Sequence, residues 1–165
     1  MLRAKTIGLA DNTAILLYVL FYVVYTICTI PAGILSDKIG RKPVLMTGYL
    51  VFAVTSLGLM FASNIYGIIL FFVIYGIFYA MIDGAQRAFV VDLAPKHLKA
   101  TALGTFHAAI GLVALPGGFI AGLLWDKISP ETTFLYGFIL AIISMVLFIF
   151  VKGKKRLRIN LKVSD

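Results

Sequence analysis

Four long intervals of this chain carry no charged side chain, and they constrain its fold more than any other feature. These intervals hold 25, 40, 26 and 20 residues and cover positions 12–36, 43–82, 100–125 and 132–151. A helix needs about 20 residues to cross the hydrocarbon core of a bilayer. Only 13% of the residues are charged and 61% are hydrophobic, whereas soluble domains carry about 25% charged residues. The pattern therefore predicts an all-α membrane protein that is embedded in the lipid bilayer.

The 40-residue interval is too long for one span, and it breaks at Ser63-Asn64. We therefore expect five transmembrane helices, at about 13–35, 43–62, 65–91, 101–124 and 132–151, between an N-terminal segment (1–12) and a basic tail (152–165). The runs are continuously apolar and do not alternate with a period of two, which excludes a transmembrane β-barrel. The stretch before Asp11 has no apolar core. We interpret the first hydrophobic run as a span and not as a signal peptide.

The basic residues predict the orientation of the five spans. Twelve of them fall on one predicted side: Lys38, Arg41, Lys42, Arg87, Lys96, Lys99, Lys152, Lys154, Lys155, Arg156, Arg158 and Lys162. The other side has three, Arg3, Lys5 and Lys127. We expect an integral protein of the cell (inner or plasma) membrane. Because basic residues concentrate in cytoplasmic loops, its C-terminus is expected in the cytoplasm and its N-terminus on the external side. The formal charge of +8 is thus an orientation signal, and we predict no nucleic-acid partner.

A short charged segment, residues 33–42, separates the first two spans. Gly33 and Gly40 bracket it, and glycine permits the close approach and positive φ that a tight interhelical turn needs. Asp37 and Arg41 are four residues apart, so that Arg41 is expected to reach the Asp37 carboxylate. A plain turn with solvated charges is the alternative interpretation.

The residues of this segment resemble a known signature. The run Gly33-x-Leu35-Ser36-Asp37-Lys38-x-Gly40-Arg41-Lys42 is similar to the loop signature of the major facilitator superfamily of secondary transporters, with every fixed position filled. The resemblance continues through positions 83–88, 92–95, 101–104, 115–118 and 123–126, in the family's order. It implies that the chain is part of a six-helix half-bundle and corresponds to helices eight to twelve of a twelve-helix transporter. The transported small solute is not identified by the resemblance. The resemblance also implies that Asp37 faces a neighbouring helix N-terminus as a cytoplasmic latch.

The register of the resemblance predicts that helix seven and the N-terminal half are missing. The superfamily's substrate path lies between two six-helix halves, and five helices of one half do not build it. We therefore expect a C-terminal fragment that is inactive alone, from a truncated or split gene or from a chain that complements another polypeptide. The missing N-terminal half is the expected protein partner. The lead-in 2–12 reads like an external loop that follows an earlier helix.

Charges inside a span are costly and are usually paired or functional. Asp83 and Arg87 are four residues apart near the cytoplasmic end of the third span. They are expected to form an ion pair, in a structural role or, alternatively, in gating or proton coupling. Arg87 snorkelling to the headgroups, with Asp92 as a second partner, is a further alternative. Asp83, Arg87 and Asp92 together are the expected inner-end charge network.

The fourth span carries the remaining candidates. His107 lies about two turns into it, with no second metal ligand at metal-binding spacing. We therefore expect a packing role or, alternatively, a place on the substrate path or a protonation role, and no metal site. Small residues and a proline follow, at Gly111, Pro116, Gly117, Gly118 and Gly122. The pair Gly118 and Gly122 predicts close helix packing, and Pro116 predicts a kink.

Two other function classes fit less well. An enzyme needs a catalytic constellation, and the sequence has no His-Glu-x-x-His motif and no serine motif with a partner. We therefore expect no enzymatic activity and no cofactor. A stand-alone accessory or assembly protein with five spans is the alternative to a transporter fragment.

Overall fold

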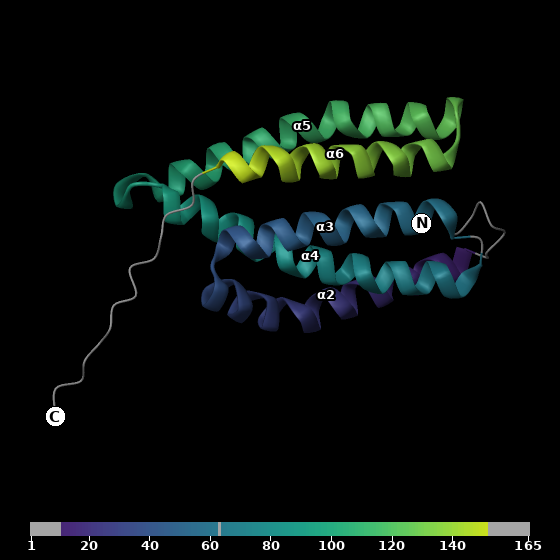
Figure 1. Ribbon diagram of the computed structural model, residues 1–165, viewed down its shortest axis with the longest axis horizontal. Coiled ribbons are helices and arrows are strands. Elements are labelled where there is room, and N and C mark those ends of the chain that lie inside the picture. The colour runs from purple at the N-terminus through teal and green to yellow at the C-terminus, as the bar shows by residue number, and fades with distance from the viewer. Residues whose placement is uncertain (1–10, 63, 152–165) are drawn as a thin grey trace.

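The computed structural model describes residues 11–62 and 64–151, which form five long helices and one short 3-10 helix (Figure 1). Their bounds are α2 Asp11–Ile39, α3 Arg41–Phe61, α4 Ile65–Leu93, η1 Lys96–Leu98, α5 Lys99–Lys127 and α6 Pro130–Phe150. All five long helices are long and apolar enough to cross a membrane. The predicted class, an all-α membrane protein with five transmembrane helices, is confirmed.

Each helix overlaps one of the five expected spans. The residues at which each span enters and leaves the membrane remain a prediction. The expectations for the external segment and the basic tail fall almost wholly on residues 1–10 and 152–165, which lie outside the described part of the chain.

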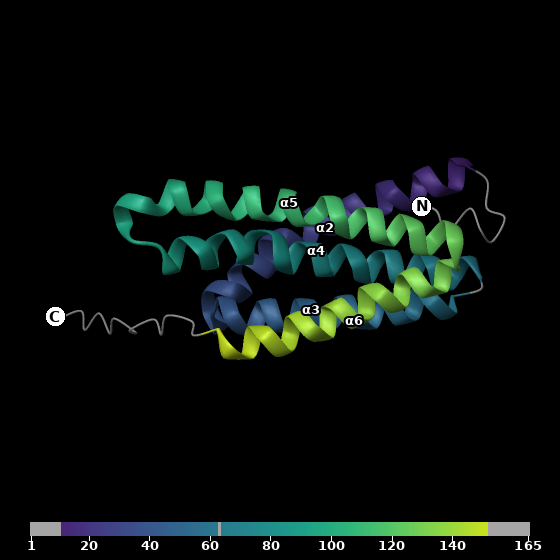
Figure 2. The ribbon, with the colours of Figure 1, turned by 90° about the horizontal axis from the view of Figure 1, so that it is seen from above.

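Consecutive helices run antiparallel in a bundle in which α3 and α4 are central. Helix α2 packs on α4, α3 lies between α4 and α6, and α5 packs mainly on α6 (Figures 1 and 2). Two turns carry side-chain caps that begin the next helix: Asn64 accepts from the Gly67 amide at 2.8 Å, and Ser129 accepts from the Thr132 amide at 3.2 Å. These caps satisfy amides that a helix N-terminus leaves without a partner.

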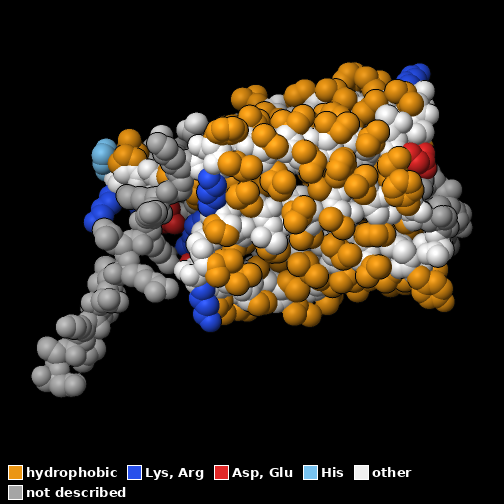
Figure 3. Space-filling view, in the orientation of Figure 1, with side chains coloured by type: hydrophobic (Ala, Val, Ile, Leu, Met, Phe, Trp, Pro, Cys, Tyr) orange, Lys and Arg blue, Asp and Glu red, His pale blue; other side chains and the backbone are white. Residues whose placement is uncertain are grey.

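The bundle has two ends, which we name by their connections. The inner end holds Gly40, the η1 helix and the end of α6, whereas the outer end holds the α3–α4 and α5–α6 turns. Figure 3 shows hydrophobic side chains over the flank, with Lys and Arg gathered mainly at the inner end. This distribution suits a bundle whose flank faces lipid and whose ends face water.

Two small apolar clusters hold α2, α3 and α4 together. Ala14, Leu17, Ala62 and Ile68 form the cluster toward the outer end, and Val44, Leu45, Ile82, Ala85 and Phe89 form the inner one. By contrast, α5 has no buried residue. The core of the described chain is therefore a three-helix unit, on which α6 packs against α3, and α5 packs against α6 and also against α4.

Candidate functional site

A single residue, Gly40, makes the turn between α2 and α3. Its φ of 100° and ψ of 157° lie in a region that side-chain-bearing residues avoid. Its amide donates to the Ser36 carbonyl at 3.1 Å, which closes the last turn of α2. The segment 33–42 is thus mostly helix, and the expected tight turn is made by one residue and not by the stretch between about 35 and 43. The expectation for Gly33 is wrong: it is helical, and a Cβ there meets no atom within 4 Å.

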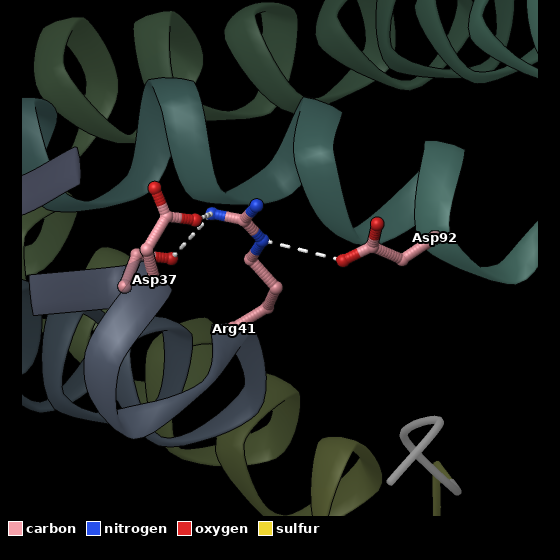
Figure 4. A network of polar contacts seen from close by, with 4 residues as sticks. Asp37, Arg41 and Asp92 are labelled. Carbon is pink, nitrogen blue, oxygen red and sulfur yellow. Dashed lines mark hydrogen bonds and ion pairs between the residues drawn. The ribbon is translucent and has the colours of Figure 1, made fainter. Parts of the chain in front are cut away.

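The one-residue turn places Arg41 among the ends of three helices (Figure 4). Its Nη1 lies 2.7 Å from the Asp37 carboxylate of α2, and its Nε lies 3.3 Å from the Asp92 carboxylate of α4. The same Nη1 donates to the Ser36 hydroxyl at 3.3 Å, and that serine is 2% exposed. Arg41 itself is largely buried. One guanidinium therefore ties α2, α3 and α4 together at the inner end.

The next residue, Lys42, reaches a fourth helix. Its Nζ donates to the carbonyls of Ile149 and Val151, at 2.8 and 2.7 Å. The last carbonyls of a helix lack intrahelical donors and carry partial negative charge, so an ammonium group stabilises them. Lys38, in contrast, is an exposed basic residue in the last turn of α2. The two adjacent basic residues at the start of α3 thus join the inner ends of α2, α4 and α6.

Asp83 and Arg87 are in contact, through the Arg87 Nη2 and the Asp83 Oδ1. The other carboxylate oxygen of Asp83 accepts from the Tyr25 hydroxyl of α2 at 2.9 Å. Asp92 belongs to the Arg41 cluster instead, and no ion pair joins it to Arg87 within the described residues. The expected single network of Asp83, Arg87 and Asp92 is therefore two separate clusters.

Two neighbouring cavities lie between the three-helix unit of α2, α3 and α4 on one side and α5 and α6 on the other. The larger, of about 510 Å³, is lined by Asp83, Gln86 and Arg87 from α4, by His107 from α5, and by seven apolar or aromatic residues: Phe52, Tyr75, Phe78, Tyr79, Ile82, Phe106 and Ile110. The smaller, of about 450 Å³, includes Trp125 and Phe134, and it shares Phe52 and Tyr75 with the first. The cavities are thus neighbours, and His107 lines the wall of the larger one.

Aromatic rings run continuously beside these cavities. Phe21 of α2 contacts the rings of Tyr25, Tyr75 and Tyr79, with centroids 5.4 to 6.3 Å apart. Tyr75 contacts Phe78 at 5.6 Å, and Phe78 contacts Phe52 at 4.9 Å. Sequence reasoning missed this cluster and the Tyr25 hydrogen bond. The spacing of four residues between Phe21 and Tyr25, and between Tyr75 and Tyr79, is the signal that would have indicated aromatic faces on both helices.

The glycines of α5 have no neighbouring helix close to them in the described structure. At Gly111, Gly117, Gly118 and Gly122, an added Cβ meets no atom within 4 Å in the described structure. Within the described residues no helix therefore packs closely on Gly118 or Gly122, and the close packing expected there stays a prediction. Pro116 lies inside α5, which continues through it from Lys99 to Lys127. Within the described residues, no three His, Cys, Asp or Glu side chains gather as a metal site.

Comparison with known proteins gives a consistent relationship. Residues 2–163 match the sequence profile of the Major Facilitator Superfamily. The chain is 52% identical over 137 residues to the uncharacterized MFS-type transporter MJ1317 of Methanocaldococcus jannaschii. The matched residues cover 83% of this chain and 34% of that protein. It is 35% identical over 103 residues to the multi-drug resistance efflux pump PmrA of Streptococcus pneumoniae, covering 62% of this chain and 26% of the pump.

A third similarity is weaker in identity but longer. The quinolone resistance protein NorA of Staphylococcus aureus is 28% identical over 147 residues, which cover 87% of this chain and 37% of that protein. The chain therefore spans about a quarter to two fifths of the length of these relatives.

Proposed function

Because this chain belongs to the major facilitator superfamily, we propose that it forms helices eight to twelve of a secondary transporter that moves a small organic solute by alternating access. The observation that carries the proposal is the Arg41 cluster, which stands inside a complete copy of the family's loop signature. The names of the streptococcal and staphylococcal relatives, an efflux pump and a quinolone resistance protein, support an organic molecule as the solute.

The inner-end contacts support a role in rigid-body movement. Arg41 and Lys42 connect the ends of α2, α3, α4 and α6, so these four helices are expected to move together. In alternating access, one bundle of helices rocks against another around a central site. Asp37, whose side chain is 55% exposed, is proposed to face the N-terminus of a helix in the other half, where the positive dipole end stabilises a carboxylate.

The larger cavity is proposed as this chain's share of the solute path. It combines an aromatic wall with an acidic, a basic and an amide side chain, the usual composition of a small-molecule site. We propose that the 165-residue chain alone does not transport, because a path in this superfamily needs two halves. No enzymatic activity is proposed, and the inner end is proposed to face the cytoplasm.

Reconstitution tests this proposal directly. The purified chain is placed in proteoliposomes alone, or together with the part of MJ1317 that precedes the segment matched by this chain. Uptake of the fluorescent dye ethidium is the readout. We expect no saturable uptake by the chain alone and saturable uptake by the pair. Asp37→Ala is expected to impair that uptake, whereas Asp126→Asn, at the outer end, serves as the matched control.

Two outcomes contradict the proposal. Saturable uptake by the chain alone points to copies of this chain building a path between them. A complex that assembles with the MJ1317 portion but carries neither ethidium nor a panel of other organic solutes favours an accessory protein without transport activity.

A further inference from the structure

The connection between α4 and α5 carries a group of exposed basic side chains. We name residues 93–99 the basic turn. It contains η1, in which the Leu98 amide donates to the Pro95 carbonyl oxygen at 3.0 Å, and the side chains of Lys96, His97 and Lys99 are exposed. Side chains three residues apart eclipse one another in a 3-10 helix. Lys99 continues η1 with a φ of −59° and a ψ of −42°, so the ammonium groups of Lys96 and Lys99 project from the same side of the turn.

The carboxylates of the inner end do not neutralise the basic turn. Each of them contacts an arginine instead: Asp37 and Asp92 pair with Arg41, and Asp83 pairs with Arg87. After Asp92, the next acidic residue in the sequence is Asp126, at the other end of α5. Within the described residues, no hydrogen bond or ion pair joins the side chain of Lys96 or Lys99 to another residue. Two neighbouring positive charges are therefore left for an anion that is not part of the described chain.

Helix lengths place the basic turn outside the hydrocarbon core. Helices α3 and α6 have 21 residues each, whereas α4 and α5 have 29 each. At 1.5 Å per residue, 21 residues match the core of about 30 Å, and eight more add about 12 Å. Figures 1 and 2 show this extra length at the inner end, where the connection of α4 to α5 reaches past the α2–α3 turn along the bundle axis. The basic turn therefore lies at the level of the lipid headgroups.

The basic turn is also amphipathic. Leu93 and Leu98, which flank Lys96, are 47% and 44% exposed. Short segments with lysine on one face and leucine on another lie in the membrane interface, where the lysines meet headgroups and the leucines meet acyl chains. A soluble anion satisfies only the lysines, whereas a phospholipid satisfies both kinds of side chain.

We propose that the basic turn binds an anionic phospholipid, with Lys96 and Lys99 on the headgroup phosphate and Leu93 and Leu98 against the acyl chains. The turn is the covalent link between the three-helix unit and α5, a helix without a buried residue. A lipid bound there holds the start of a helix that few protein contacts fix. The inference requires a chain embedded in a membrane and does not rest on transport.

Native mass spectrometry of the purified chain in detergent tests this proposal, because it resolves lipids bound one at a time. The chain is titrated with dioleoyl phosphatidylglycerol, which is anionic, and with dioleoyl phosphatidylcholine, which has the same acyl chains and no net charge. The preference is the ratio of the two dissociation constants. We expect phosphatidylglycerol to bind about 25-fold more tightly, at about fivefold for each lysine.

Three variants locate this preference. Lys96→Gln with Lys99→Gln is expected to abolish it, whereas Lys96→Arg with Lys99→Arg is expected to keep it, because the positive charges remain. Lys127→Gln is the matched control, since it removes one exposed lysine at the outer end. Circular dichroism checks that each variant is helical.

Four outcomes overturn the proposal. Equal affinity for the two lipids shows that charge does not select the ligand. A preference that survives in the double glutamine variant belongs to other basic residues, such as those of 152–158. An equal loss in the Lys127 variant shows a general effect of net charge. Displacement of phosphatidylglycerol by inorganic phosphate at the same concentration shows a site for a soluble anion and not for a lipid.

Discussion

The polar contacts of Arg41 and Lys42 at the inner end of the bundle differ in reach from the two helix caps at its outer end. At the inner end, Arg41 pairs with Asp92, 51 residues away, and Lys42 bonds carbonyls 107 and 109 residues away. At the outer end, the caps of Asn64 and Ser129 reach only three residues along the chain. Inner-end contacts therefore join separate helices, whereas these outer-end contacts shape single turns.

The difference bears on the movement that the proposed function requires. A contact between helices transmits displacement from one helix to the next, and a local cap does not. Under the proposed function the bundle rocks as one body, and such contacts would hold its helices together. Two adjacent residues of the loop signature, Arg41 and Lys42, make these contacts. Substitutions at the inner end are therefore expected to destabilise the protein more than substitutions at the outer end.

The largest expected effect is at the inner turn. Gly40→Ala places a Cβ on a backbone with a φ of 100° and a ψ of 157°, which costs about 1–3 kcal/mol in the free energy of unfolding. Gly33→Ala is the matched control within the same signature, since its position is helical and open, and alanine favours a helix there. Unfolding in a denaturing-detergent titration measures both. Equal losses for the two variants would show that the turn geometry is not the cause.

A smaller loss is expected from Arg41→Gln. The substitution removes contacts to Asp37 and Asp92, whose side chains are 55% and 41% exposed. Because these partners are partly solvated, we expect about 1–2 kcal/mol and not the cost of a fully buried pair. A double-mutant cycle with Asp92→Asn is expected to show that the two losses are not additive. Additive losses contradict the tie between α3 and α4.

The smallest expected effect is at the outer end. Asn64→Ala removes the cap of α4, at a cost of about 0.5–1 kcal/mol. Hydrogen exchange is expected to rise at the amides of the first turn of α4 and to stay unchanged at the inner end. Faster exchange at Arg41 or Asp92 in this variant contradicts the view that the outer caps act locally.

The sequence predicted contacts within one helix or its turn better than contacts between helices. The charge-free intervals predict five helices because a bilayer requires apolar length, and the Asp37–Arg41 and Asp83–Arg87 contacts follow from the spacing of four residues. The partners of Asp92 and Lys42 depend on which helices lie side by side. No local spacing encodes that arrangement, so the Arg41–Asp92 pair was missed.

Glycine composition shows the same limit. Glycine at positions 33, 118 and 122 allows a helix to approach closely, but it does not determine whether a helix lies there. An added Cβ at these positions meets no atom within 4 Å in the described structure. At Gly76, which was not singled out, a Cβ would lie 3.1 Å from the Phe21 carbonyl oxygen of α2. The distinction between the two kinds of glycine required the packing of α2 on α4.

Cysteine accessibility in intact bacterial cells tests the central claim most directly, namely that the end bearing the Arg41 and Lys42 ties is the cytoplasmic one. The background variant Cys28→Ser removes the only native cysteine, and single cysteines are then placed at His97 on η1 and at Ile128 in the outer turn. We predict that a membrane-impermeant maleimide labels the position-128 variant in intact cells and the position-97 variant only after permeabilisation. Labelling of position 97 from outside, with position 128 protected, would contradict the orientation and the proposed place of this chain in the transporter.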